Sequence, residues 1–231
     1  MAKLNGPLGS KLRGKVGEVV AAKTVGGDTA IRAYQPVVKN PNTLRQRVSR
    51  NKMSIASKIA AVLSEAIGIG YAKATASEKM YPRNMFVKSI IPVGAAVMTL
   101  DGENPVVDYT KLPVSKKMGI SEAPVTVVAA GTEQGSKVVT ASNAESVTLA
   151  AGETLGLVVV GLDAQKNSSI VRMGSAAAGV TLSASDVTSM DGGTMYAFFK
   201  VIPEAYNGVA ATDIPWKYPS DTSACTVFTL A

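Results

Sequence analysis

Residues 39–58 read KNPNTLRQRVSRNKMSIASK and combine a chain break with the start of a basic helix. The Asn-Pro-Asn sequence at 40–42 interrupts regular structure. Thr43 and Gln46 then match a capping box, in which the Thr43 hydroxyl accepts from the Gln46 backbone N–H and the Gln46 side chain reaches back. This pattern predicts a helix over residues 44–67.

A second helix is expected shortly after the first. Gly68 is the predicted stop of the first helix, because glycine favours the left-handed conformation that ends helices. Pro82 suits a first helical turn and predicts a helix that begins within the stretch 81–88. Its inward-facing side chains are expected to be Met85, Phe86 and Ile90.

The first helix carries an apolar stripe with cations around it. The apolar positions recur at helical spacing: Leu44, Val48, Ile55, Ile59, Val62 and Ala66. At about 100° per residue, Arg45 and Lys52 fall on one flank of this stripe. Arg47, Arg50 and Lys58 fall on the other flank and the back. The stripe must pack on something, whereas the cations on its flanks are left to meet phosphates, an acidic surface or water.

The composition counts against most enzyme classes. The 231-residue chain has no histidine and a single cysteine, Cys225, which is expected to be a buried thiol on a strand. A histidine-based triad, a cysteine zinc site and an intrachain disulfide are therefore excluded. We predict a protein that is not an enzyme and has no cofactor. Asp101, Glu103 and Asp108 lie close in sequence; a metal site is one interpretation, and solvated loop acids are the favoured one.

The charge divides along the chain. Residues 1–90 hold 16 Lys and Arg against 4 acids, whereas residues 91–231 hold 8 against 13, giving the net +7. The difference predicts two regions with different roles. We place their boundary at residue 92, with a basic hairpin and helical region over 1–92 and a second domain over 93–231.

The two regions are expected to be an N-terminal β-hairpin with helices and a C-terminal antiparallel β-sandwich. Residues 12–36 predict the hairpin, with one run over 16–20 and a turn at Gly26-Gly27-Asp28. Seven later runs separated by turn residues predict an immunoglobulin-like or jelly-roll-like sandwich. They span 125–129, 146–149, 154–161, 169–173, 180–183, 195–202 and 224–230. The fold class is therefore α+β, and Trp216 is interpreted as a lid over the sandwich, with an exposed contact as the alternative.

No secretory or membrane-spanning segment is expected. The N-terminus lacks the apolar core of a signal peptide, and runs such as 155–162 are too short to span a bilayer. We therefore predict a protein that is made in a cytoplasm and does not insert in a membrane.

The cations of the N-terminal region are the candidate site. The helix has no acid before Glu65, whereas solvated helix faces usually mix both signs. Arg and Lys in such a group neutralise phosphates in a sequence-independent way. The predicted nucleic-acid-binding residues are Lys11, Arg13, Lys15, Arg45, Arg47, Arg50 and Lys52. DNA, RNA and an acidic protein surface, such as that of a neighbouring copy, stay open as partners, and so does an ordinary solvated helix face.

Three motifs carry a resemblance to a known family. They are the Gly14-Lys15-Val16-Gly17 hairpin, the Asn40-Pro41-Asn42-Thr43 helix start and Gln46-Arg47, followed by a β-rich half. The chain resembles an uncharacterised family of proteins from gut Bacteroidetes, their phages and small mobile elements, chiefly over residues 4–90. The resemblance implies a viral or mobile-element context and assigns no site.

Three functional hypotheses follow. The first is a structural protein of a phage or mobile element that self-assembles as a virion or coat component, contacts nucleic acid, and is found in the virion or the host cytoplasm. The second is a stand-alone, sequence-nonspecific nucleic-acid-binding protein. The third is a surface adhesion or decoration module that uses the sandwich loops.

Overall fold

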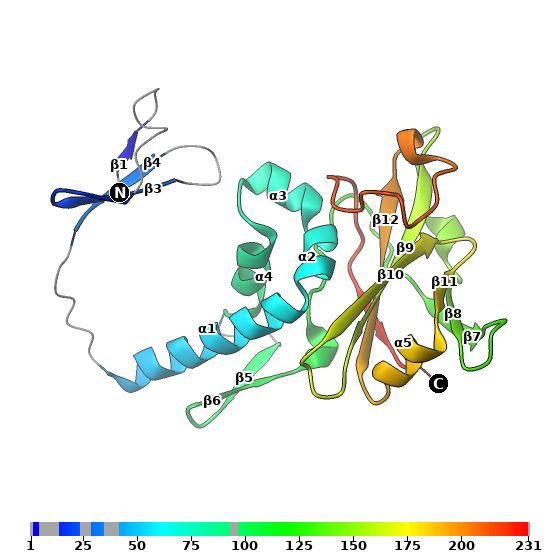
Figure 1. The fold of residues 1–231 in the computed structure, drawn as a ribbon, viewed down its shortest axis with the longest axis horizontal. Helices are drawn as coiled ribbons and strands as arrows, with labels where there is room; N and C mark the ends of the chain where they lie inside the picture. The colour runs from blue at the N-terminus through cyan, green and yellow to red at the C-terminus, as the bar shows by residue number, and fades with distance from the viewer. Residues whose placement is uncertain (1, 5–13, 24–28, 35–41, 93–96, 231) are drawn as a thin grey trace.

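The computed structural model describes residues 2–4, 14–23, 29–34, 42–92 and 97–230. It confirms the predicted α+β class, with all strand pairs of its sheets antiparallel and a β-rich C-terminal half. The first four helices along the chain lie on one side of a central sheet, and a second sheet lies on the other side (Figure 1).

Four helices form the first layer. They are α1 (Leu44–Val62), α2 (Ser64–Gly70), α3 (Ala72–Glu78) and α4 (Pro82–Ile90). As predicted, α4 starts at its proline and buries Met85, Phe86 and Ile90. The single helix over residues 44–67 is wrong, because the chain bends by 82° between α1 and α2. Gly68 lies inside α2 rather than at a helix end.

The bend follows from burial. Leu63, at the break, is fully buried, and so are Ala66 and Ile67 just after it. A straight helix would carry some of these apolar positions away from the sheet, whereas the bend keeps them in one core. At the start of α1, Thr43 accepts from the Gln46 N–H at 3.4 Å. The Gln46 Oε1 atom is buried without a partner, so the reciprocal half of the capping box is not formed.

The central sheet is buried on both faces. Its order is β10 (Ser169–Ser175), β9 (Thr154–Leu162), β12 (Thr194–Ile202) and β13 (Thr226–Phe228). Val158 pairs with Phe198, and both face the helices, whereas Leu157 and Phe199 face the second sheet. This double burial explains why β9 and β12 are continuous apolar runs rather than alternating ones.

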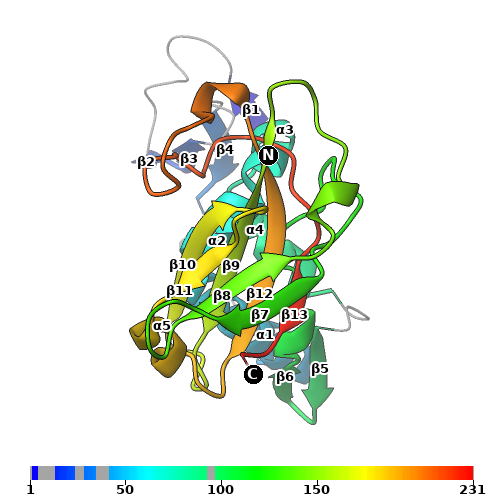
Figure 2. The same cartoon turned by 90° about the vertical axis from the view of Figure 1, so that its right-hand side faces the viewer.

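The second sheet completes two packed sheets. Its order is β11 (Val180–Leu182), β8 (Lys137–Ala141) and β7 (Thr126–Ala130). Figure 2 views the molecule from the side on which this sheet lies. A separate hairpin joins β5 (Met98–Asp101) to β6 (Asn104–Val107).

The C-terminal half differs from the prediction in one strand and one helix, and it agrees on Trp216. The predicted strand at 146–149 is wrong, because Val147 and Leu149 pack on the core from a loop that follows a short 3-10 helix, η3 (Ala144–Ser146). Helix α5 (Ala184–Ser189), capped by Ser183, was not expected. Trp216 is buried and its indole N–H donates to Ala211 O at 2.7 Å, as a lid over the core would do.

The N-terminal strands form a small sheet of their own. Its order is β1 (Ala2–Leu4), β4 (Thr29–Ala33), β3 (Val19–Lys23) and β2 (Gly14–Val16). The β3–β4 hairpin agrees with the prediction, while its turn at 26–28 lies outside the described residues. The single run over 16–20 is wrong, because the chain turns at Gly17, whose φ of 60° favours glycine. None of the described residues of this sheet belongs to either hydrophobic cluster of the body.

The helices and the C-terminal sheets share one core. Ile67 and Phe86 lie in the same buried cluster as Val158 and Tyr196. The division at residue 92 therefore does not separate two cores. Among the described residues, no helix by itself is long and apolar enough to cross a membrane; α1 and α2 meet that length and composition only as a bent pair.

Candidate nucleic-acid interface

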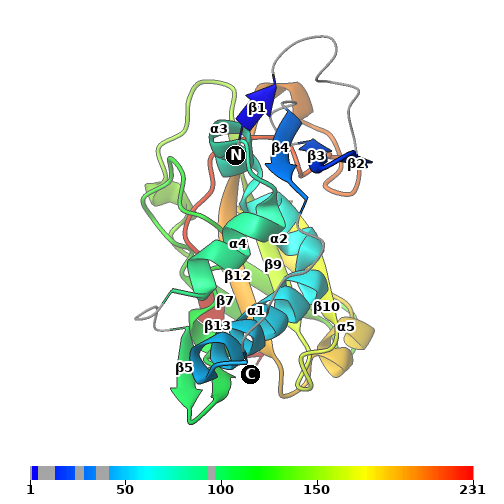
Figure 3. The ribbon, with the colours of Figure 1, turned by 90° about the vertical axis from the view of Figure 1, so that its left-hand side faces the viewer.

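Helix α1 lies on the outer side of the helical layer and exposes four of its five cations. Arg45, Arg47 and Arg50 are all exposed in its first two turns, and Lys58 is exposed farther along. Figure 3 shows α1 from this side, lying across the molecule in front of the sheets. Arg47, Arg50 and Lys58 fall within roughly 80° around the helix axis. The first turn holds no acid, so the partial positive charge of the helix start adds to that of Arg45.

Arg47 has a partner within the molecule. Its guanidinium lies 2.9 Å from the Glu103 carboxylate, and both side chains are about half exposed. An exposed pair of this kind is weak, and a phosphate can compete for the guanidinium. The β5–β6 hairpin, which carries Glu103, thereby links to the basic face of α1.

Lys52 differs from the other predicted cations. The sequence predicts that it binds nucleic acid, but its residue is only 7% exposed, so it is not part of the exposed basic surface. Its neighbours on the inward side of α1 are Ala56 and Ile59, one and two turns later. The flank that carries Lys52 packs against the body, whereas Arg45 stays exposed two turns before the first buried residue of α1. We therefore leave Lys52 out of the interface.

The N-terminal sheet carries a second group of cations on one face. Lys11 and Arg13 lie outside the described residues. Lys15 pairs with Val20, which pairs with Arg32 on the next strand. Cross-strand partners point to the same face of a sheet, so Lys15 and Arg32 flank Val20. Both cations are exposed.

An aromatic ring lies beside this row. The Lys15 Nζ atom sits 3.8 Å from the centroid of the Tyr34 ring, which is 40% exposed. Arg32 and Tyr34 were not among the predicted residues. Period-two spacing could have found them, because positions 32 and 34 face the same side of a strand. The sheet thus offers charge and one ring, a combination that can contact both phosphates and bases.

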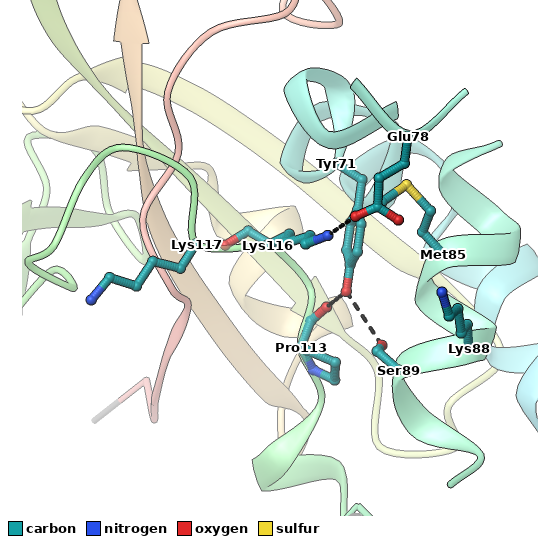
Figure 4. A pocket seen from close by; sticks show the side chains of 9 residues that line it. Tyr71, Glu78, Met85, Lys88, Ser89, Pro113, Lys116 and Lys117 are labelled. Carbon is teal, nitrogen blue, oxygen red and sulfur yellow. Dashed lines mark hydrogen bonds and ion pairs between the residues drawn. The ribbon is translucent and has the colours of Figure 1, made fainter. Parts of the chain in front are cut away.

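A pocket between the helices and the following loop is the main alternative site (Figure 4). Its volume is about 390 Å³. It is lined by Tyr71, Glu78, Met85, Lys88, Ser89, Pro113, Ser115, Lys116 and Lys117. Figure 4 shows Lys117 pointing away from the others. Lys116 forms an ion pair with Glu78 across the opening.

Most polar side chains of this pocket already have partners. The Tyr71 hydroxyl donates to Pro113 O at 2.7 Å, and burial raises the pKa of Tyr71 to about 12. A hydrogen bond and the charge of Lys116 lower the pKa of Glu78. Tyr71 is thus a poor acid and Glu78 a poor base near neutral pH. The contacts tie α3 and α4 to the loop at 113–117 and indicate a structural role.

The acids considered as a metal site have other partners as well. Asp108 accepts from the Thr110 N–H at 3.1 Å and pairs with Lys111, and these contacts lower its pKa to about 2. Within the described ranges, no three acidic or cysteine side chains are grouped as metal ligands. Cys225 is half-buried just before β13, and its thiol donates to Leu112 O at 3.2 Å.

Comparisons with known proteins give no further indication of function, so the two basic surfaces are the evidence for it. Among the residues that the structure describes, the exposed cations of α1 and of the N-terminal sheet are the group that favours a class of partner. A scan against protein-family models, a search of curated proteins and a search of solved structures each found no match to this chain.

Proposed function

We propose that this protein is a non-enzymatic structural protein that assembles with copies of itself and contacts nucleic acid through its N-terminal cations. One observation carries the nucleic-acid part of the proposal. Arg45 and Arg50 on α1, and Lys15 and Arg32 on the sheet, are all exposed in a region of the chain poor in acids. Such surfaces bind the phosphate backbone and release its counterions.

The proposed contact is mainly with phosphates. Arginine offers two parallel hydrogen bonds to a phosphate in addition to its charge. Tyr34 is the one aromatic side chain beside the Lys15 row, so stacking on successive bases is not the main source of affinity. We therefore expect weak sequence preference and strong salt dependence.

The wider context of the proposal is a phage or mobile element. The resemblance of residues 4–90 to proteins from gut Bacteroidetes, their phages and small mobile elements supports it. A basic segment facing nucleic acid, joined to packed sheets that meet neighbouring copies, suits a coat or virion component. The proposed location is the virion or the host cytoplasm.

A second candidate is a nucleic-acid-binding protein that acts outside any particle. The observation in its favour is that the described part of the N-terminal sheet lies outside both hydrophobic clusters. Binding through Lys15 and Arg32 would then need no assembly. Electron microscopy of the purified protein, with and without nucleic acid, separates the two: ordered particles support the first and their absence supports the second.

Salt-dependent binding tests the nucleic-acid contact. Labelled duplex DNA, single-stranded DNA and single-stranded RNA are titrated with the protein between about 50 and 200 mM salt. In the double variant Arg32→Gln and Arg45→Gln, we expect the slope of log K against log salt to fall by about two. The matched control, Lys117→Gln and Lys217→Gln, removes two exposed charges from the C-terminal half.

The control should keep the wild-type slope. Equal losses in both double variants would mean that net charge alone governs binding, and the proposed surface would be wrong. A protein that binds none of the three nucleic acids at the lowest salt would also contradict the proposal. A ratio of absorbance at 260 and 280 nm that drops after a high-salt wash would support it.

A further inference from the structure

Strand β7 is the border of the second sheet. It pairs with β8 on one side, and no described strand pairs with it on the other. In Figure 2 the sheet of β7, β8 and β11 faces the viewer, on the side away from the helices. An edge strand leaves a row of backbone donors and acceptors for another strand.

The backbone hydrogen bonds between β7 and β8 show which backbone groups face outward. Ser142 N donates to Val125 O at 2.9 Å, and Gly131 N donates to Ser136 O at 2.9 Å. Hydrogen-bonded pairs alternate along an antiparallel ladder, so the odd-numbered residues of β7 bond to β8. The N–H and C=O groups of the even-numbered residues Thr126, Val128 and Ala130 therefore point to the free edge.

The exposed side of β7 is apolar. Val125 is 55% exposed and Val127 is 49% exposed, and Ala129 is exposed beside them. No charged residue lies between Glu122 and Glu133. Natural edge strands are usually blunted by a charge, a bulge or a proline. Here Pro124 stands just before the strand, so the five residues of β7 keep an open edge.

The border of the central sheet shows the contrast. Edge strand β10 carries Arg172, whose guanidinium makes two hydrogen bonds, at 2.9 and 2.7 Å, to the Asp186 carboxylate of α5. Another strand that paired with β10 would have to lie against the charged side chain of Arg172, which is fixed by its hydrogen bonds to α5. Strand β13, the opposite border, is uncharged but only three residues long. Of the borders of the two packed sheets, β7 is the uncharged one with five residues.

We propose that β7 pairs with β7 of a second copy of this chain, antiparallel about a two-fold axis at Val128. This inference rests on the self-assembly in the proposed function and names its surface. A second copy fits because a two-fold interface must match itself, and an uncharged strand meets its own copy without like charges opposed. The pairing joins two three-stranded sheets into one.

The outward groups fix the register of the pairing. Val128 faces its own copy in a hydrogen-bonded pair, and Thr126 faces Ala130 in the next ones. Val127 then lies opposite Ala129 of the second copy in the close, non-hydrogen-bonded position. Two exposed positions of the strand, Val127 and Ala129, thereby cover each other.

Charge placement tests this register directly. The variant Val127→Lys with Ala129→Lys sets lysines opposite each other twice across the axis. The variant Val127→Glu with Ala129→Lys sets a glutamate opposite a lysine twice, with two charged substitutions in the same strand. Sedimentation equilibrium and light scattering of the full chain over a concentration series measure the assembly, and circular dichroism checks the fold.

We expect wild-type protein to self-associate, the Lys–Lys variant to associate about tenfold more weakly, and the Glu–Lys variant to recover. If the Lys–Lys variant does not fold, Ala130→Pro takes its place, because it removes one outward N–H at an exposed residue and must also weaken association. If the variants self-associate as strongly as wild type, the β7 proposal is wrong, while the self-assembly of the proposed function stands. Wild-type protein that stays monomeric overturns both this inference and the self-assembly of the proposed function.

Discussion

The central sheet and the N-terminal sheet are both four-stranded and antiparallel, yet they are stabilised differently. Strands β9 and β12 are buried on both faces, between the helices and the second sheet. The described N-terminal strands add no residue to either cluster and expose cations on one face. The difference teaches that the buried core of the body and the cations of the N-terminal sheet lie in different parts of the chain, whereas the cations of α1 stand on a helix that packs into the body.

The largest expected effect is on the body. Phe198 is fully buried in β12 and faces the helical layer, so Phe198→Ala leaves a cavity and should cost about 3–5 kcal/mol of unfolding free energy. The matched change Val20→Ala in the N-terminal sheet should shift the same transition by less than about 0.5 kcal/mol. Urea unfolding followed by circular dichroism measures both. Equal shifts would show that the two sheets unfold as one unit.

A buried lysine provides the next effect. Lys200 is fully buried on the helix-facing side of β12, and its Nζ donates to Ile69 O at 3.3 Å and Tyr218 O at 3.0 Å. Burial lowers its pKa from 10.5 to about 8, against the opposing charge of Asp221. It therefore joins α2 to the sheet while carrying a charge at neutral pH that burial disfavours.

The sign of the pH effect follows from this lowered pKa. Between pH 8 and 10.5 the unfolded chain holds the Lys200 proton and the folded chain releases it, so stability rises with pH. From pH 8 to 9.5 this contribution is on the order of 2 kcal/mol. Below pH 8 both states are protonated and the contribution is flat.

Unfolding of wild type and Lys200→Met over this range isolates the effect. Burial raises the pKa of Cys225, Tyr71 and Tyr218, which lowers stability as pH rises, but both proteins keep these groups. The unfolding free energy of wild type relative to that of Lys200→Met should therefore rise by about 2 kcal/mol between pH 8 and 9.5. A constant difference would mean that Lys200 keeps an ordinary pKa.

The smallest expected effect on stability comes from removing residues 1–41. This removes the whole N-terminal sheet and leaves Thr43 to cap α1. The transition of the body should shift by less than about 0.5 kcal/mol, because no described residue of that sheet lies in its clusters. Binding to nucleic acid should weaken sharply in the same protein. If the shortened protein lost its cooperative unfolding transition, the body would depend on the N-terminal sheet for its fold, and the prediction would be wrong.

Much of the fold could be predicted from local patterns. The turn residues and apolar runs locate β9, β10, β11 and β12 within two residues at each end, and Pro82 locates the start of α4. The pattern at 146–149 failed because a loop can also bury alternate apolar side chains. Strand β8 was missed because it follows the turn at 131–136 and its apolar run is short. The Ser183–Asp186 capping box was a usable but overlooked mark of α5.

The candidate site could be predicted only in part. The cations of α1 stand in a short, acid-free run, so Arg45, Arg47 and Arg50 could be named from the sequence. That Lys52 is buried could not, because helix spacing gives the angle of a side chain but not which flank the body covers. The pairing of Arg47 with Glu103 could not be predicted from the sequence either, because Glu103 lies in a hairpin far along the chain.

The sequence by itself determined the α+β class, the helix start at Thr43, the strong strands and the separation of basic from acidic halves. These features depend on residues close in the chain and on composition. Only the tertiary structure decided that the chain bends after Val62, that β9 and β12 are covered on both faces, and that β7 is left as an open border. Each of these depends on which distant segments share a core, and local spacing carries no record of that.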